Sequence, residues 1–293
     1  MNTETLDPRY RGVERWPTHC AVEAMLEGQM AAIAALQTQT AAIAAAADAA
    51  AARLETGGRL VFVGAGTSGR LAVQDGTELH PTFGWPAERT VFLMAGGADA
   101  LTKAREGAED DADAARAEVA AAGVGPEDVM IGVAASGRTP FTVAAIASAR
   151  TAGALTIGIA NNAATPLTDA AEHVVVAATG SEIVAGSTRM KAGTAQKAAL
   201  NLLSTTIMIR LGLVYDGRMV AMRVSNAKLL RRARAMVQDL TGVAPDAAAD
   251  ALARGGNDIR RAVLIARGLT PEDAAALLDR HNGRLDAAIA AAR

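Results

Sequence analysis

The sequence predicts an α/β protein built on a doubly wound, five-stranded parallel sheet, preceded by a long helix and followed by a small helical domain. Five short apolar runs alternate with helical stretches, which is the pattern of βαβ units. Alanine-rich sequence without proline precedes the first run, and short helix-like segments separated by glycine or proline follow the last. We expect an N-terminal helical arm at 1–49, a central domain at 50–215 and a C-terminal helical domain at 216–293.

The arm is predicted to contain one long helix or two. Residues 19–56 contain no proline, carry apolar side chains at roughly helical spacing and stop at two glycines. The residues before this stretch are polar and predict no regular element.

The central domain is predicted from its apolar runs. They are near-continuous in hydrophobic character, as expected of strands that are buried on both faces. Helices are expected over 68–79, 99–122 and 140–152, and a long helix over 190–212 buries one apolar face. The five strand sequences are "RLVFVGAG", "RTVFLMAGG", "DVMIGVAASG", "LTIGIANN" and "HVVVAATG".

Composition excludes several classes of protein. The net charge of −2, with no basic block except "KLLRRARA" near position 230, argues against nucleic-acid binding. The single cysteine, Cys20, cannot form an intramolecular disulfide and fits a reducing compartment, and no metal-ligand spacing is present. We find neither the apolar core of a signal peptide nor a charge-free membrane span. We therefore expect a cytoplasmic protein that binds no metal, nucleic acid or membrane.

Three of the predicted strands end in loops rich in hydroxyl groups: "GAGTSGR", "ASGRTP" and "TGSEIVAGSTR". The first fits the spacing of a dinucleotide-binding turn, but the second strand ends "FLMAGG", without the acidic residue that would hold a ribose. A phosphate monoester explains the second loop better, because Ser136 and Thr139 can join backbone amides around its oxygens. Any one of these hydroxyls could simply cap a helix. Three such loops together favour a phosphate ligand.

The sequences of these loops resemble those of a known protein family. The "GAGTSGR" and "SGRT" loops resemble a sugar isomerase (SIS) domain, a sugar-phosphate-binding fold with a five-stranded sheet. Longer stretches, "GAGTSGRLAVQDGTELHPTFG", "EGAED", "AASGRTP" and "GSTRMKAGTAQKAALNLLSTTIMIRLGLVYDGRMV", resemble the N-acetylmuramic acid 6-phosphate etherase family, to which the glucokinase regulatory protein is related. The resemblance covers residues 50–240 well.

The resemblance implies an enzyme of peptidoglycan recycling that removes the D-lactyl ether of its substrate to give N-acetylglucosamine 6-phosphate and D-lactate, without metal or nucleotide cofactor. It also implies two catalytic glutamates, which match Glu78 in "GTELHPTFG" and Glu109 in "EGAED". SIS domains usually pair through helices, so a homodimer is expected. The residues expected to bind the substrate and its phosphate are Gly66, Thr67, Ser68, Ser136, Gly137, Arg138, Thr139, Glu182, Ser187, Thr188 and Lys191.

Ether cleavage explains why two carboxyl groups are needed. Once the sugar opens to its aldehyde, the hydrogen at C2 becomes acidic and the ether oxygen at C3 lies β to it. Elimination then requires a base at C2 and an acid at the ether oxygen, and water addition uses the same groups in reverse. We assign Glu78 as the acid and Glu109 as the base, although the reverse assignment gives the same overall reaction.

Other interpretations of these residues remain open from the sequence. Without the resemblance, Glu109 reads as part of a solvated acidic helix face and Glu78 as a residue near a helix end before proline. Glu182 suits either a substrate hydroxyl or a loop ion pair. Leu79-His80 stands where the family usually has Cys-Pro, which places an extra titratable group beside the presumed acid.

Two alternative functions remain as well. One is a non-catalytic sugar-phosphate sensor that binds a partner through its helical tail, and the presence of both glutamates argues against it. The other is an isomerase or lyase acting on another 6-phosphosugar, which would form a ketose or another product without releasing lactate.

Overall fold

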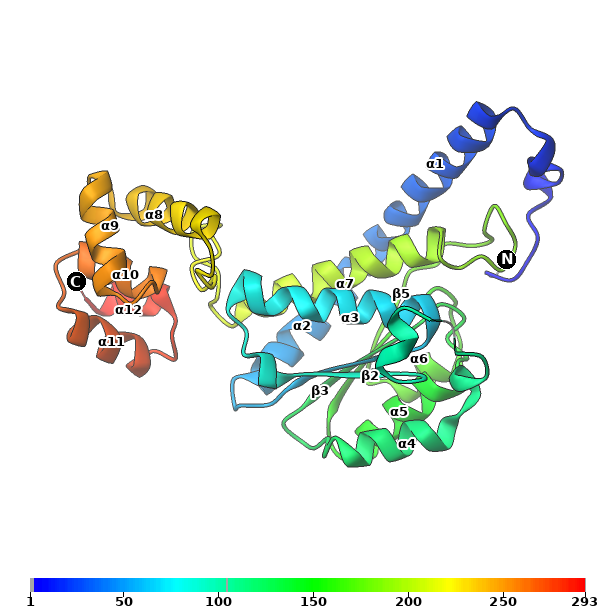
Figure 1. Cartoon of the computed structure of the whole chain (residues 1–293). Coiled ribbons are helices and arrows are strands. Elements are labelled where there is room, and N and C mark those ends of the chain that lie inside the picture. Colours follow the sequence, from blue (N-terminus) through cyan, green and yellow to red (C-terminus); the bar gives the residue numbers. More distant parts are fainter. Residues whose placement is uncertain (1–2, 104, 293) are drawn as a thin grey trace. The chain divides into compact units, whose positions relative to one another are not determined.

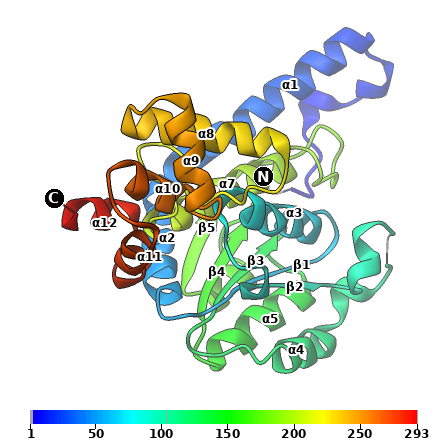
Figure 2. The same cartoon turned by 60° about the vertical axis from the view of Figure 1, so that its left-hand side comes forward.

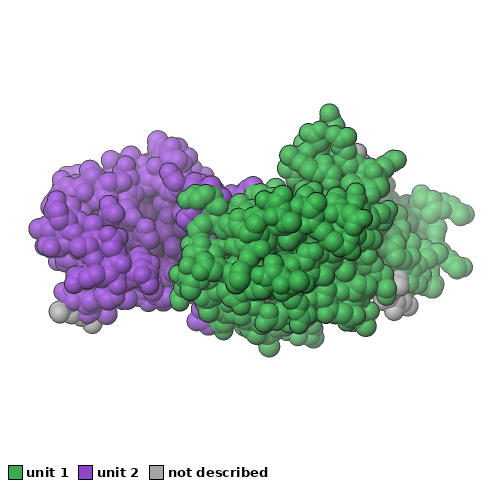
Figure 3. Space-filling model, turned by 90° about the horizontal axis from the view of Figure 1, so that it is seen from below, with its two compact units in different colours: residues 1–76, 88–206 green, residues 77–87, 207–293 purple. Residues whose placement is uncertain are grey.

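The computed structural model describes residues 3–103 and 105–292. The chain forms two compact units, coloured separately in Figure 3. The first comprises residues 1–76 and 88–206, and the second comprises 77–87 and 207–293.

The first unit contains the predicted five-stranded parallel sheet, in the order β2-β1-β3-β4-β5. The chain runs outward from β1 in one direction to β2 and in the other through β3 to β5. Ligands of doubly wound sheets bind where the strand order reverses, here between β1 and β3. The strands are β1 (Leu60–Gly64), β2 (Thr90–Met94), β3 (Val129–Ala134), β4 (Leu155–Ala160) and β5 (His173–Val176).

Helices cover both faces of this sheet. In Figure 1, α4, α5 and α6 lie on one face, and α2, α3 and α7 lie on the other. The α-helices that begin in the first unit are α1 (Thr18–Ala34), α2 (Thr40–Leu54), α3 (Gly66–Phe83), α4 (Ala112–Ala121), α5 (Pro140–Thr151), α6 (Pro166–Ala170) and α7 (Lys191–Arg210). The 3₁₀ turns are η1 (Pro8–Tyr10), η2 (Val13–Arg15), η3 (Ala35–Gln39), η4 (Ala87–Arg89), η5 (Ala98–Leu101) and η6 (Ala108–Asp110).

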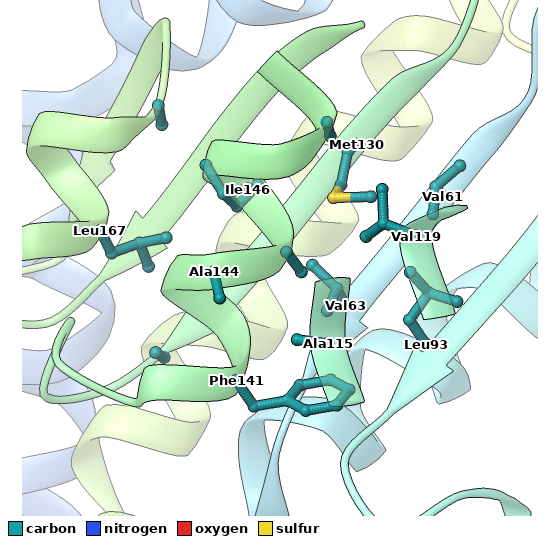
Figure 4. Close-up of a cluster of buried hydrophobic side chains, with 14 of the residues drawn as sticks. Val61, Val63, Leu93, Ala115, Val119, Met130, Phe141, Ala144, Ile146 and Leu167 are labelled. Carbon is teal, nitrogen blue, oxygen red and sulfur yellow. The ribbon is translucent and has the colours of Figure 1, made fainter. Parts of the chain in front are cut away.

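The core beneath α4 and α5 follows the alternation of strand side chains. Val61 and Val63 point from β1 toward these helices, where they meet Phe141 and other buried residues (Figure 4). Each fully buried side chain of this kind stabilises the fold by about 1.5–3 kcal/mol. Gly132 of β3 lets α5 approach closely, because an added Cβ would stand 2.6 Å from Ile146.

One predicted helix is much shorter than expected. The interval 99–122 contains two 3₁₀ turns, and α4 begins only at Ala112. Gly107 has a φ of +75°, which interrupts any helix, and the side chain of Asp111 caps α4 by accepting a 2.8 Å hydrogen bond from the Ala114 amide. The predicted helix begins too early because the acidic residues of this loop resemble those of a first helical turn.

The arm is helical, as predicted. Its second half, α2, packs on β5 and β4 with Ile43 and Leu54 buried, whereas α1 extends away from the sheet (Figures 1 and 2). Within the described part of the chain, the run Thr18–Leu54 is the one stretch that is long and apolar enough to cross a membrane, with 28% of its most apolar window buried. It carries charged residues such as Glu27 and Asp48. The run meets this criterion by length and composition alone, and one such helix is weak evidence for a membrane span.

The second unit is a helical bundle with its own core. Buried side chains from each helix that lies wholly within this unit form that core, among them Val237, Leu252, Val263, Leu277 and Leu285. Two helices begin with proline in the first turn, and one of these is also capped by Thr270. Asn226 and Asp258 cap two further helices. The helices are α8 (Ala227–Thr241), α9 (Pro245–Arg254), α10 (Ile259–Ala266), α11 (Pro271–Arg280) and α12 (Leu285–Ala291).

Candidate active site

The turn after β1 brings the start of α3 directly to the end of the strand. An added Cβ on Gly69 would stand 2.7 Å from the Gly64 carbonyl oxygen, so helix and strand approach closely only because these residues are glycines. Gly66 has a φ of +53° and opens α3. The unpaired amides of the first helical turn, with Thr67 and Ser68, therefore stand at the carboxyl end of the sheet.

The turn after β3 is built in a similar way. Gly137 has a φ of +65°, and the Ser136 hydroxyl accepts a 3.1 Å hydrogen bond from the Arg138 amide. Thr139 occupies the cap position of α5, yet its side chain makes no capping hydrogen bond. Helix capping thus does not account for the Thr139 hydroxyl.

A pocket of about 370 Å³ joins the two turns at the β1/β3 switch point. Eight of the predicted site residues line it, and five further residues complete its wall. The predicted ones are Gly66, Thr67, Ser68, Glu109, Ser136, Arg138, Thr139 and Thr188. The others are Glu4, Ala65, Asp110, Ala135 and Pro140.

The pocket wall carries groups of both signs. The N-terminal ends of α3 and α5 and the exposed Arg138 guanidinium favour an anion. Glu4, Glu109 and Asp110 contribute carboxyl groups to the same wall. Among residues 3–103 and 105–292, no three His, Cys, Asp or Glu side chains are grouped as metal ligands.

Glu109 lies on the short turn η6 and is exposed. It lines both the pocket between the two turns and a neighbouring one of about 210 Å³, whose wall also includes Arg70 and Arg105. Its position on a loop at the sheet's carboxyl edge differs from the solvated helix face that acidic composition alone predicts.

Glu78 is exposed and lies on α3, within the segment 77–87 that groups with the second unit. The structure thus assigns the two predicted catalytic glutamates to different compact units. In the same segment, Leu79 is buried, and the His80 ring nitrogen Nδ1 lies 2.8 Å from the Trp85 carbonyl oxygen. A carbonyl can only accept, so Nδ1 carries the proton and Nε2 is the nitrogen left to react with other groups.

Four predicted binding residues do not line the pocket: Gly137, Glu182, Ser187 and Lys191. The carboxylate of Glu182 is fully buried and accepts 2.9 Å hydrogen bonds from the amides of Lys191 and Ala192, at the start of α7. The Lys191 ammonium donates a 2.8 Å hydrogen bond to the Ser181 carbonyl. Glu182 therefore caps α7 instead of facing a substrate hydroxyl. Gly137 affects the pocket only through the backbone conformation of the turn that carries Ser136 and Arg138.

Sequence reasoning missed two carboxyl groups of the pocket. Asp110 follows Glu109 directly and could have been inferred from it. Glu4 comes from the polar opening of the chain, for which the sequence predicts no element. No local pattern signals that this segment folds back onto the sheet.

Comparisons with known proteins agree with the fold. The SIS domain matches residues 110–206, and the glucokinase regulatory protein N-terminal SIS domain matches residues 42–150. A curated N-acetylmuramic acid 6-phosphate etherase of Deinococcus radiodurans is 49% identical, covering 96% of this chain and 92% of the relative. Etherases of the same name from Rubrobacter xylanophilus and Streptomyces avermitilis are 44% and 43% identical, over 93% and 100% of this chain and 91% and 94% of theirs.

A solved structure from Bacteroides fragilis, assigned to the phosphosugar isomerases, shares the fold. Its TM-score is 0.52 at 19% identity, and the match covers 69% of this chain and 95% of that one.

Proposed function

The chain belongs to the N-acetylmuramic acid 6-phosphate etherase family, and from this membership we propose how its own residues carry out the reaction. The protein is a lyase that cleaves the ether of N-acetylmuramic acid 6-phosphate. The observation that supports our assignment of the site is the pocket at the β1/β3 switch point, where two helix N-termini, hydroxyl groups and Glu109 line one cavity.

The 6-phosphate binds between the two strand-to-helix turns. Amides at the starts of α3 and α5 donate to its oxygens, joined by the hydroxyls of Thr67, Ser68 and Ser136. Arg138 supplies a positive charge from the pocket wall. Binding at this point leaves the sugar to extend toward the carboxyl groups.

The reaction then proceeds on the open-chain sugar. Glu109 removes the proton from C2, the electron pair forms a C2–C3 double bond, and the C3–O bond breaks as Glu78 protonates the departing D-lactate. Addition of water in the reverse sense, with its hydroxyl at C3 and a proton at C2, gives N-acetylglucosamine 6-phosphate. The role of Glu78 rests on its place in the "GTELHPTFG" motif.

We propose that the protein works as a cytoplasmic homodimer, with no metal, nucleotide or nucleic-acid partner. The exposed apolar side chains of α1 and Leu202 of α7 support pairing of helices between copies. The three domains predicted at 1–49, 50–215 and 216–293 remain the proposed functional division of the chain.

Supplying N-acetylmuramic acid 6-phosphate to the purified protein tests the mechanism. D-lactate should form, and in deuterated water the product should carry deuterium at C2. Glu109→Gln and Glu78→Gln should each lower kcat by about 100-fold or more and retain binding of N-acetylglucosamine 6-phosphate. Glu127→Gln, an exposed change beside the opposite end of β3, is the matched control. Ketose formation without lactate, or full activity in both variants, would contradict the proposal.

A further inference from the structure

The first described residues of the chain are anchored beside the pocket. Thr3 is fully buried, and its carbonyl oxygen accepts a 3.3 Å hydrogen bond from the Gly186 amide in the loop that leads to α7. On its other side, the Thr3 amide donates to the Asn162 side-chain oxygen at 3.4 Å. Thr3 therefore joins the loop after β4 to the loop before α7.

Asn162 connects this anchor to the phosphate turn. Its amide nitrogen donates to the Thr3 hydroxyl at 3.1 Å and to the Ala135 carbonyl oxygen at 2.9 Å. Ala135 lines the pocket and directly precedes Ser136. The position of the N-terminal residues is thus fixed relative to the turn that receives the phosphate.

Glu4 follows this anchor and forms part of the pocket wall. It lines the pocket of about 370 Å³ that joins the two turns and an adjoining one of about 390 Å³, and the two pockets share Glu4, Ser136 and Arg138. One carboxylate oxygen lies close to Gly186, where an added Cβ would stand 3.3 Å from it. The carboxylate therefore lies near a loop that, like the two phosphate turns, borders the sheet's carboxyl edge.

The charge of a carboxylate in this position determines which groups of a bound phosphosugar it can contact. An ionised carboxylate only accepts hydrogen bonds, and it repels a phosphate dianion. The sugar of the proposed substrate offers hydroxyl groups and an acetamido N–H as donors. We propose that Glu4 is a substrate-binding residue that accepts hydrogen bonds from O–H or N–H groups of the bound sugar and makes no contact with its phosphate. This inference rests on the proposed function.

Binding measurements on Glu4→Ala and Glu4→Gln test the proposal. Calorimetry should show that N-acetylglucosamine 6-phosphate binds about tenfold more weakly to the alanine variant, with a smaller loss for glutamine, which keeps one acceptor oxygen. Inorganic phosphate should bind as well as before or better, because a repelling charge is gone. KM for the ether substrate should rise with little change in kcat. Glu14→Gln, exposed on the same N-terminal segment and paired with Arg15, should change nothing.

The outcomes separate this inference from the proposed function. Unchanged phosphosugar affinity in both Glu4 variants would overturn the inference even if the wild-type protein releases lactate. A parallel loss of phosphosugar and inorganic phosphate affinity would also overturn it, since that result means that the turn itself has moved. Weaker phosphosugar binding in the variants of a protein that releases no lactate would uphold the role of Glu4 and reject the etherase mechanism. If the wild-type protein binds no 6-phosphosugar, both fail.

Discussion

At Gly137 the backbone adopts a φ of +65° in the turn that carries Ser136 and Arg138. An added Cβ would lie 2.2 Å from the Thr165 hydroxyl, and Thr165 is buried where it caps α6. Both the backbone conformation and the space exclude any side chain at this position.

We expect Gly137→Ala to lower the free energy of unfolding by about 3 kcal/mol and to weaken phosphosugar binding, because the turn must shift to relieve the clash. Gly125→Ala is the matched control, since an added Cβ there meets nothing within 4 Å. Denaturant unfolding and calorimetric titration measure the two effects. Equal stability of the two variants would show that Thr165 yields at little cost and that the turn is not constrained as described.

Glu182 shows why residue type alone misleads. An acidic residue in a loop of hydroxyls suits a sugar, but it also suits the amides at a helix N-terminus. The sequence does not reveal that the loop folds back so that Glu182 reaches the start of α7, nine residues later in the chain. The opposite error occurs at Glu4, which reaches the pocket from a segment without any local pattern.

Among the elements, β1 and β3 are joined at their starts by an ion pair. The Arg59 guanidinium lies 2.7 Å from Asp128, and Asp128 also accepts hydrogen bonds from the Arg59 and Gly125 amides. Burial by itself would raise the pKa of Asp128, but these hydrogen bonds outweigh it and leave the pKa below its ordinary value. The carboxylate is therefore more favourable in the folded chain than in the unfolded one.

This pair should make stability depend on pH in the acid range. A lowered carboxyl pKa stabilises the fold fully above the unfolded value of about 3.9, and the contribution is lost as pH falls through the folded pKa. We expect Asp128→Asn to cost about 2 kcal/mol at pH 7 and progressively less as the pH falls below about 4. Urea unfolding across this range measures it, with the exposed Asp113→Asn as control. A cost that is the same at pH 7 and pH 3 would exclude the ionic origin.

The elements differ in how well sequence predicts them. All five strands are recognisable, because a strand buried on both faces must be apolar along its length. The turns after β1 and β3 are equally recognisable, because both require glycine. Close packing of helix on strand requires it in the first turn, and a left-handed backbone beside Thr165 requires it in the second. The start of a helix in acidic sequence is harder to recognise. The aspartate that caps α4 is one of several acidic residues close together, and the sequence does not show which of them is the cap.

At the scale of the whole molecule, α3 and α7 each begin in the first compact unit and end in the second. The boundary passes between Gly76 and Thr77 within α3, two residues before Glu78. Sequence predicts the sheet and the helical tail separately, but nothing in its periodicity indicates that this single helix contributes to both. The motif around Glu78 thus spans the boundary between the two compact units, although its sequence predicts one continuous loop and helix.

One face of α1 exposes an apolar stripe that the described residues of its own chain leave open to solvent. Val22, Leu26, Met30 and Ile33 follow helical spacing on that face, with 53%, 58%, 61% and 46% of their surface exposed. A stripe of this length on a soluble enzyme is typical of a surface that pairs with another molecule. A second copy of the chain, as in the proposed homodimer, is the simplest partner for this stripe, because it offers an identical one.

We expect the double substitution Leu26→Glu and Met30→Glu to weaken self-association at least 100-fold, since pairing would bury two charges without partners. The monomer should keep its helical content, because both side chains are exposed in the single chain. Sedimentation velocity over a range of concentrations measures the association, and circular dichroism checks the fold. Leu101→Glu, an exposed leucine outside α1, should leave association unchanged. An unaltered dimer in the double variant would place the interface elsewhere, and a monomeric wild-type protein would reject the homodimer itself.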